Sequence, residues 1–240
     1  MRATVGVLGC DGGYPGPGGA GSGYLLRVGQ DTVALDMGPG TLGRLQQEVA
    51  IEDLDAVFIS HEHPDHRSDL EGLAVGLKEI GAGRPLSVYA TAGVKEAFFF
   101  PDWGVFEWHV VCDGDLAQVG GLSFRFGQTD HGPETLALRA DWPGGSFAYS
   151  ADTGPGWSVS ALGEKIGLFL CEATWDEAHK GTGGHLSGAE AGAMAKAAGV
   201  ERLVITHIRP RLHQGAVVAE AAASFGAPVS RATPGAVYHL

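Results

Sequence analysis

The sequence predicts an α/β fold in which two β-sheets pack together and carry helices on their outer faces. Short apolar runs with β-branched residues recur along the chain, and the first half is rich in strands and hairpins. The second half alternates strand-like with helix-like runs. Two layered sheets with helices outside accommodate both halves. A chain of 240 residues with 44% hydrophobic composition can bury a substantial core, so we expect residues 1–240 to form one domain.

The individual elements follow one another in a regular order. Runs with the composition of strands are found at 4–8, 24–28, 32–35, 56–59, 86–89, 122–127, 136–140, 147–150, 167–170 and 203–206. Runs with helical periodicity are found at 41–49, 68–80, 94–99, 187–198 and 215–225. The fourth helical run has the clearest boundaries, with Ser187 as N-cap, Glu190 three residues later and Gly199 as the stop.

Composition and charge restrict the classes of partner. Sixteen basic and 28 acidic residues give a net charge of −12, which argues against a surface that grips a large nucleic acid through many phosphates. Cys10, Cys112 and Cys171 lie far apart, so we expect three reduced, buried thiols in a cytoplasmic protein. The N-terminus is too short and too soon interrupted by glycine to be a secretory signal, and no apolar stretch reaches membrane-spanning length.

The octapeptide ISHEHPDH places four potential metal ligands at the end of an apolar strand. His61 and His63 are two positions apart, so an extended segment directs both imidazoles to the same side. Asp65 and His66 follow Pro64, which forces a turn. Clusters of imidazole and carboxylate at this spacing are metal sites far more often than polar surface loops, and one such loop can serve two neighbouring cations.

A glycine pattern near the N-terminus has the form of a dinucleotide-binding motif. Gly16, Gly18 and Gly21 fit G-x-G-x-x-G after the first strand, and Asp36 stands where a ribose-binding acid would follow. The next segment, SGYLLRVGQDTVALD, has the pattern of a hairpin, so no helix N-terminus would face a pyrophosphate. We therefore expect a flexible glycine-rich loop beside the site, and we expect Asp36 to anchor the histidine loop through hydrogen bonds.

One loop cannot complete two coordination spheres, so further histidine or aspartate residues are expected at strand ends downstream. His131 follows LSFRFGQTD, Asp152 closes SFAYSAD and His207 closes RLVITH. Each has an apolar or alternating run before it and a turn after it. Strand ends of an α/β protein gather at one edge of a sheet, where its chemistry is usually placed.

These residues resemble the metallo-β-lactamase superfamily, in its ribonuclease Z-like phosphodiesterase branch. The resemblance covers nearly the whole chain, and the matching segments occur in the family's order: VGVLGCDGG, SGYLLRV, VALDMGPG, ISHEHPDH, TDHGPETLALR, AYSADTG, LCEATW, GGHLSGAEAG and LVITHIRP. It implies an αββα four-layer sandwich of two mixed β-sheets flanked by helices, with a dinuclear zinc site. The implied ligands are three residues for one ion, three for the other and one bridging carboxylate: His61, His63 and His131; Asp65, His66 and His207; and Asp152.

The resemblance also implies catalytic roles for Asp65, Glu172 and His185. Two neighbouring cations can acidify a shared water and clamp phosphate oxygens, and Asp65 would orient that nucleophile. In this branch Glu172 orients His185, which stabilises charge on the phosphate or donates a proton to the leaving oxygen. The alternative is that His185 merely lies at the start of a helix without a catalytic role, and that Glu172 pairs with a surface lysine. The family usually has histidine at the position of Cys171, a departure that leaves the proposed pair intact.

The spacing of the ligands bears on the size of the substrate. Ribonuclease Z usually grips precursor transfer RNA with an arm inserted between the third histidine and the bridging aspartate. Here the 20 residues 132–151 separate His131 from Asp152, and two strands and a turn use them fully. The compact pattern is more similar to cyclic-nucleotide phosphodiesterases of the branch. The expected activity is hydrolysis of a small anionic phosphodiester, with a cyclic nucleotide as the leading candidate.

Other functions stay open at this point. They are an armless ribonuclease Z-like tRNA 3′-processing endonuclease, a thioester or lactone hydrolase, and a non-catalytic metal-binding module. The absence of cysteine among the ligands argues against an antibiotic-hydrolysing β-lactamase. Zinc is the expected metal, although the same ligands accept manganese or iron. A homodimer is one option because dimers are common in similar proteins, and either loop 12–23 or loop 176–184 could close over the site.

Overall fold

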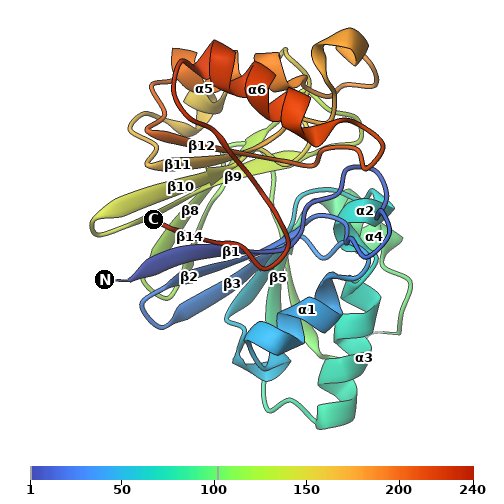
Figure 1. Ribbon diagram of the computed structural model, residues 1–240. Helices are drawn as coiled ribbons and strands as arrows, with labels where there is room; N and C mark the ends of the chain where they lie inside the picture. The colour runs from blue at the N-terminus through green and yellow to red at the C-terminus, as the bar shows by residue number, and fades with distance from the viewer. Residues whose placement is uncertain (1, 102) are drawn as a thin grey trace.

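The computed structural model describes residues 2–101 and 103–240, which form two seven-stranded β-sheets flanked by helices (Figure 1). The strands of the first sheet are β1 Ala3–Gly9, β2 Gly23–Val28, β3 Asp31–Leu35, β4 Ala56–Ile59, β5 Leu86–Ala90, β6 Phe106–Val110 and β14 Val237–His239. Those of the second are β7 Leu116–Val119, β8 Leu122–Gln128, β9 Leu136–Trp142, β10 Gly145–Tyr149, β11 Leu168–Glu172, β12 Arg202–Thr206 and β13 Ser230–Arg231.

The helices are α1 Thr41–Glu48, α2 Pro64–Arg67, α3 Leu70–Ile80, α4 Ala92–Ala97, α5 Gly188–Ala197 and α6 Gln214–Phe225, with short 3-10 turns at Ile51–Asp53, Val159–Leu162 and Glu177–His179. Helices α1 and α3 lie outside the first sheet and helices α5 and α6 outside the second, whereas α2 lies at the end of the sandwich (Figure 1). The sheet orders are β14-β1-β2-β3-β4-β5-β6 and β13-β12-β11-β10-β9-β8-β7. Parallel and antiparallel pairs occur in both sheets, so the predicted αββα sandwich of mixed sheets is confirmed.

Three layers of apolar side chains separate the four layers of structure. The central layer lies between the sheets, where Phe58 stacks on Phe126 with ring centroids 5.3 Å apart. A second cluster packs α5 and α6 against the second sheet, and a third packs α1 and α3 against the first. Burial of this apolar surface is the main term that stabilises the sandwich.

The predicted elements differ from the observed ones chiefly at the sheet edges. The ten strand-like runs are all strands within one or two residues of the expected bounds, but β7, β13 and β14 were not predicted. These three are edge strands and are half exposed, so their apolar alternation is weak. The helix expected at 68–80 begins at Leu70 and follows a separate turn of helix, α2.

The cysteines are free, but one of them is not placed as expected. Cys10 and Cys171 are buried, whereas Cys112 is exposed, so the expectation of three buried thiols is wrong at that position. Cys112 follows the edge strand β6 in a turn, where its amide and thiol contact the carboxylate of Asp115. None of the described helices combines the length and apolar character that a bilayer-spanning segment requires.

The two helices on the second sheet pack unusually closely. An ideal Cβ added at Gly188 would lie 2.3 Å from the carbonyl oxygen of Val217, and one at Gly192 would lie 2.2 Å from that of Ala221. Because real Cβ atoms do not approach backbone oxygen this closely, the close approach of α5 to α6 at these two positions requires glycine.

A capping box fixes the start of α5. The Ser187 hydroxyl accepts a hydrogen bond from the Glu190 amide at 3.2 Å, and the Glu190 carboxylate accepts one from the Ser187 amide at 2.8 Å. This reciprocal pair satisfies two amides at the helix N-terminus. Because His185 lies two residues before the cap, the packing of α5 against α6 also determines where that histidine stands.

Replacing Gly192 with alanine is expected to lower the free energy of unfolding by about 1–3 kcal/mol, because the added methyl would force the two helices apart. Gly43→Ala, in an exposed part of α1 with open space around the added Cβ, is the control and should be neutral or stabilising by up to about 1 kcal/mol. Urea unfolding followed by circular dichroism measures both. Equal stability of Gly192→Ala and the parent would contradict this packing.

Candidate metal centre

The structure brings the predicted strand-end residues together at one edge of the sandwich. Ligand atoms that all lie within 4.8 Å of one another define three overlapping clusters: His61, His63, His131 and Asp152; Asp65, His66 and His207; and Asp152, His185 and His207. The segments that supply them follow β4, β8, β10, β11 and β12. Parallel neighbours among these strands end at the same edge, so residues far apart in the sequence meet there.

The first cluster consists of three histidines around one oxygen of Asp152. The Nε2 atom of His61 lies 3.0 Å from Nδ1 of His63, and that Nδ1 lies 3.3 Å from Nε2 of His131. Oδ2 of Asp152 is 3.7 Å from His61 Nε2 and 3.8 Å from His131 Nε2. Four donor atoms therefore face a common point.

The second cluster surrounds the other oxygen of the same carboxylate. Nε2 of His207 lies 3.2 Å from Nε2 of His66 and 3.1 Å from Oδ2 of Asp65. Oδ1 of Asp152 is 3.2 Å from His66 Nε2 and 3.5 Å from His207 Nε2. Asp152 thus presents one oxygen to each cluster.

This donor set fits a pair of divalent cations. Two ligand atoms bound to one tetrahedral zinc ion stand about 3.3 Å apart, which matches the spacing of the nitrogens here. Oδ1 of Asp152 is buried and has no hydrogen-bond partner among the described residues. An orphaned buried carboxylate oxygen is costly unless a cation faces it. The role of these residues as metal ligands stays a prediction, but their chemistry and spacing support it.

Hydrogen bonds behind the histidines leave the inward nitrogens free to bind. Nδ1 of His66 lies 2.8 Å from Oδ2 of Asp36, which can only accept, so His66 donates there. Ser60 Oγ contacts the same oxygen at 3.0 Å and lies 2.9 Å from Nδ1 of His61. If Ser60 donates to Asp36 it accepts from His61. Both rings then keep a lone pair on Nε2, as metal ligation requires.

The same arrangement recurs at two further histidines. Nδ1 of His131 donates to the carbonyl of Gly184 at 3.1 Å, and Nδ1 of His207 lies 2.8 Å from the hydroxyl of Thr174. These contacts again direct Nε2 toward the centre. The contact of Gly184 also shows that loop 176–184 reaches the first cluster.

Asp36 anchors the histidine loop, as expected, and also joins the two sheets. Its carboxylate accepts from the Ser60 amide at 2.7 Å and from the Tyr149 hydroxyl, on the opposite sheet, at 2.7 Å. Burial raises the pKa of Tyr149, so this hydroxyl stays protonated and donates. Asp36 lies behind His66 and contacts none of the inward-facing atoms.

Three residues at these strand ends have a left-handed backbone. The φ angles are +58° at Asp36, +52° at Ala151 and +56° at His207. Side chains other than glycine rarely adopt this conformation, and it persists only where the surroundings impose it. Each residue lies immediately after a strand or next to a predicted ligand, so the turn that aims the side chain inward is itself strained.

The glycine-rich loop contacts the second cluster. The amide of Gly13 donates to Oδ2 of Asp65 at 2.8 Å. The segment after this loop forms the hairpin of β2 and β3, as predicted.

The buried Glu172 and the half-buried His185 form a pair beside the clusters. Oε1 of Glu172 accepts from Nδ1 of His185 at 2.9 Å and from the Thr153 amide at 2.8 Å. Burial lowers the pKa of His185, but the charge of Glu172 and this hydrogen bond raise it to about 8. Glu172 therefore contacts His185 and not a surface lysine, and the imidazole is largely protonated near neutral pH.

Thr174 is a site residue that sequence reasoning missed. Its hydroxyl lies 2.7 Å from Oε2 of Glu172, 2.8 Å from Nδ1 of His207 and 3.3 Å from Nδ1 of His185. It thus links the Glu172 pair to a predicted metal ligand. The only available signal was its position two residues after Glu172, because a threonine carries no charge or metal affinity that would single it out.

Comparison with known proteins identifies a matching family, relatives in sequence and a similar crystal structure. Residues 31–208 match the model of the beta-lactamase superfamily domain. "Uncharacterized protein Rv1339" of Mycobacterium tuberculosis is 36% identical over 95% of this chain and 89% of its own length. The crystal structure of the metallo-beta-lactamase fold protein YhfI from Bacillus subtilis superposes with a TM-score of 0.92 at 28% identity, covering 100% of this chain and 99% of that one.

YhfI is also a sequence relative, named "Probable metallo-hydrolase", at 30% identity over 87% of both chains. Ribonuclease Z of Methanopyrus kandleri is 34% identical over a shorter part, 57% of this chain and 49% of its own. With two donor clusters that suit divalent cations, the chain is therefore a metallo-hydrolase of the beta-lactamase superfamily.

Proposed function

We propose that this metallo-hydrolase cleaves a small anionic phosphodiester with two divalent metal ions, and that a cyclic nucleotide is the leading substrate. The observation that carries the proposal is the carboxylate of Asp152, whose two oxygens face two separate histidine clusters. Zinc is the proposed metal because imidazole and carboxylate donors at this spacing suit it, and manganese or iron would fit the same donors. Free thiols support the proposed cytoplasmic location.

The proposed centre divides the work between metal and protein. When bound, a pair of divalent ions lowers the pKa of a water and neutralises charge on phosphate oxygens. Asp65 is negatively charged at neutral pH, as an aspartate normally is. Its Oδ2 accepts from the Gly13 amide and faces the nitrogens of the second cluster, so Oδ1 is the oxygen that would accept a hydrogen bond from the attacking water and orient it.

His185 is proposed as the proton donor. Glu172 holds Nδ1, and among the described residues no group is hydrogen-bonded to Nε2 of His185. With a pKa of about 8 this ring carries a proton on Nε2 near neutrality, which it would give to the departing ester oxygen. Glu172 is a positioning residue in this scheme, because it fixes the ring and favours its charged form.

The proposed substrate is small because the fold leaves no long extension beside the site. Residues 132–151 are taken up by β9 and β10 and by the turn between them, so a long arm is absent from this segment. The net charge of −12 gives no general grip on a large nucleic acid. The likeness to a ribonuclease Z favours armless tRNA processing as the second candidate, and a thioester or lactone hydrolase is the third.

A substrate panel tests the proposed activity. The metal-loaded protein is expected to hydrolyse cyclic AMP and bis(p-nitrophenyl) phosphate, and to leave precursor tRNA and a thioester largely intact. Product release would be followed by chromatography or absorbance. Turnover confined to the tRNA would favour the second candidate, and turnover confined to the thioester would overturn the phosphodiesterase proposal.

Removing the proposed proton donor should lower the rate of hydrolysis without lowering the metal content. His185→Ala is expected to lower kcat about 100- to 10,000-fold, because the leaving oxygen would depart without a positioned acid. Its metal content should equal that of the parent. His239→Ala, at an exposed position near the C-terminus, is the matched control and should keep full activity. Full activity in His185→Ala would exclude the proposed role.

Loss of the bridging carboxylate should instead remove metal. Asp152→Ala is expected to bring the metal-to-protein ratio well below that of the parent, because both clusters lose an oxygen donor. Asp53→Ala removes an exposed carboxylate from a 3-10 turn and should retain the metal. Plasma mass spectrometry on dialysed protein measures both, and an unchanged ratio in Asp152→Ala would rule out the bridge.

A further inference from the structure

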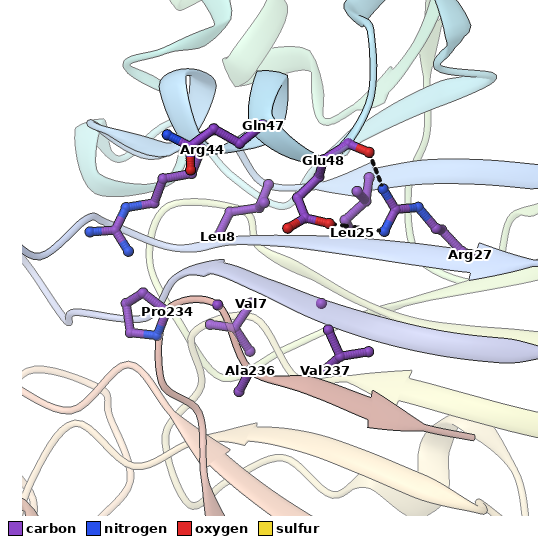
Figure 2. Close-up of a pocket in the computed structure, with 12 residues that line it drawn as sticks. Val7, Leu8, Leu25, Arg27, Arg44, Gln47, Glu48, Pro234, Ala236 and Val237 are labelled. Atoms are coloured by element: carbon purple, nitrogen blue, oxygen red, sulfur yellow. Dashed lines mark hydrogen bonds and ion pairs between the residues drawn. The ribbon is translucent and has the colours of Figure 1, made fainter.

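One cavity, which lies away from the metal centre, is lined by two arginines, Arg27 and Arg44. It measures about 410 Å³ and lies between β1, β14 and α1 (Figure 2). Arg27 pairs there with Glu48 at 3.3 Å, and Arg44 donates to the carbonyl of Gly18 at 2.6 Å. Both side chains therefore already have a hydrogen-bond partner, a carboxylate for Arg27 and a backbone carbonyl for Arg44.

A second cavity of about 410 Å³ is different in this respect. Its lining residues are Tyr14, Trp175, Arg209, Arg211 and Leu212. Among the described residues, neither arginine side chain has a hydrogen bond or a carboxylate within 4.0 Å, and Nε of Arg209 is buried without a partner. Arg211 is exposed and Arg209 is half-buried, so the buried Nε of Arg209 is the atom that lacks the partner a buried donor normally has.

This cavity adjoins the proposed metal centre. Arg209 stands two residues after His207, and its guanidinium lies close to Gly13, since an ideal Cβ on Gly13 would be 3.8 Å from Cζ of Arg209. The amide of Gly13 donates to Asp65, a predicted ligand. A substrate whose phosphodiester occupies the centre would therefore extend naturally past Arg209.

Trp175 holds Arg209 in a defined orientation. The guanidinium carbon lies 4.3 Å from the centroid of the indole ring, and the indole N–H donates to the carbonyl of Thr182 at 2.8 Å. His179 packs on the same ring with centroids 5.9 Å apart. One face of the guanidinium is thus occupied by a cation–π contact, while its N–H edge is free to donate. That edge is the part of arginine that binds phosphate oxygens in pairs.

We propose that Arg209 and Arg211 bind a second phosphate of the substrate, separate from the phosphodiester that is hydrolysed. The inference rests on the proposed function. A diester carries one negative charge, and the proposed pair of divalent ions would more than neutralise it. A substrate with one phosphate would therefore leave Arg209 and Arg211 without an anion to bind. A terminal phosphomonoester, with a charge of about −1.5 to −2, or a second diester of a cyclic dinucleotide would supply the missing anion.

Matched substrates test this inference on the metal-loaded enzyme. ApA carries one phosphate, pApA adds a terminal phosphomonoester, and cyclic di-AMP adds a second diester. The value of kcat/KM for pApA or for cyclic di-AMP is expected to exceed that for ApA about ten-fold, the effect of one charge-assisted contact. Which of the two is preferred identifies the source of the second phosphate.

Substitutions assign that preference to the two arginines. Arg209→Ala and Arg211→Ala should each bring the ratio of kcat/KM between the preferred substrate and ApA close to one. Arg209→Lys should keep part of the preference, because the charge remains while the paired N–H donors are lost. Arg125→Ala removes an exposed arginine from β8 and is the control, with an unchanged ratio.

A binding measurement gives a readout independent of turnover. Isothermal titration of the metal-loaded protein with adenosine 3′,5′-bisphosphate and with AMP should show about ten-fold tighter binding of the bisphosphate, lost in Arg211→Ala. Equal kcat/KM for all three diesters would overturn the inference and leave the proposed function standing. If no diester is hydrolysed, the proposed function fails, and equal binding of the two ligands would then reject the second phosphate site as well.

Discussion

The geometry of the site depends on the hydrogen bonds that the Asp36 carboxylate accepts. The carboxylate is fully buried between the two sheets, and it accepts hydrogen bonds from Ser60 and His66 on one side and from Tyr149 on the other. Without it these buried donors would lose their partner, at a cost of about 1–3 kcal/mol for each. This group thus links the two sheets at their shared edge and orients the histidine loop so that its free nitrogens face the centre.

The ligand clusters contain several features that by themselves lower the stability of the fold. Three residues take a left-handed backbone, imidazole nitrogens crowd to within 3.0–3.3 Å, and an oxygen of Asp152 has no hydrogen-bond partner among the described residues. Each feature is unfavourable by itself. A cation in each cluster would relieve the crowding of lone pairs and the orphaned oxygen together, which explains why apolar packing on both sides must be extensive enough to hold the groups in place.

Charge is distributed in a way that suits a small anionic substrate. The protein as a whole is acidic, yet Arg209 and Arg211, which have no ion-pair partner among the described residues, line a cavity next to the proposed metal sites. An anion is therefore attracted at close range, where the low dielectric of the site strengthens the interaction, while a long polyanion meets a repelling surface. The short hairpin of β9 and β10 keeps this edge accessible without an added arm.

The sequence by itself determined the inner strands, the fold class and the positions of the seven predicted ligands, because apolar runs and the polar residues that end them are local features that can be read along the chain. Tertiary structure alone decided the rest. Which oxygen of Asp152 faces which cluster, the link made by Thr174 and the stacking of Arg209 on Trp175 are contacts between segments far apart in the sequence. Edge strands and the exposure of Cys112 were also decided there, since each depends on which neighbour happens to pack beside it and not on any periodicity of its own.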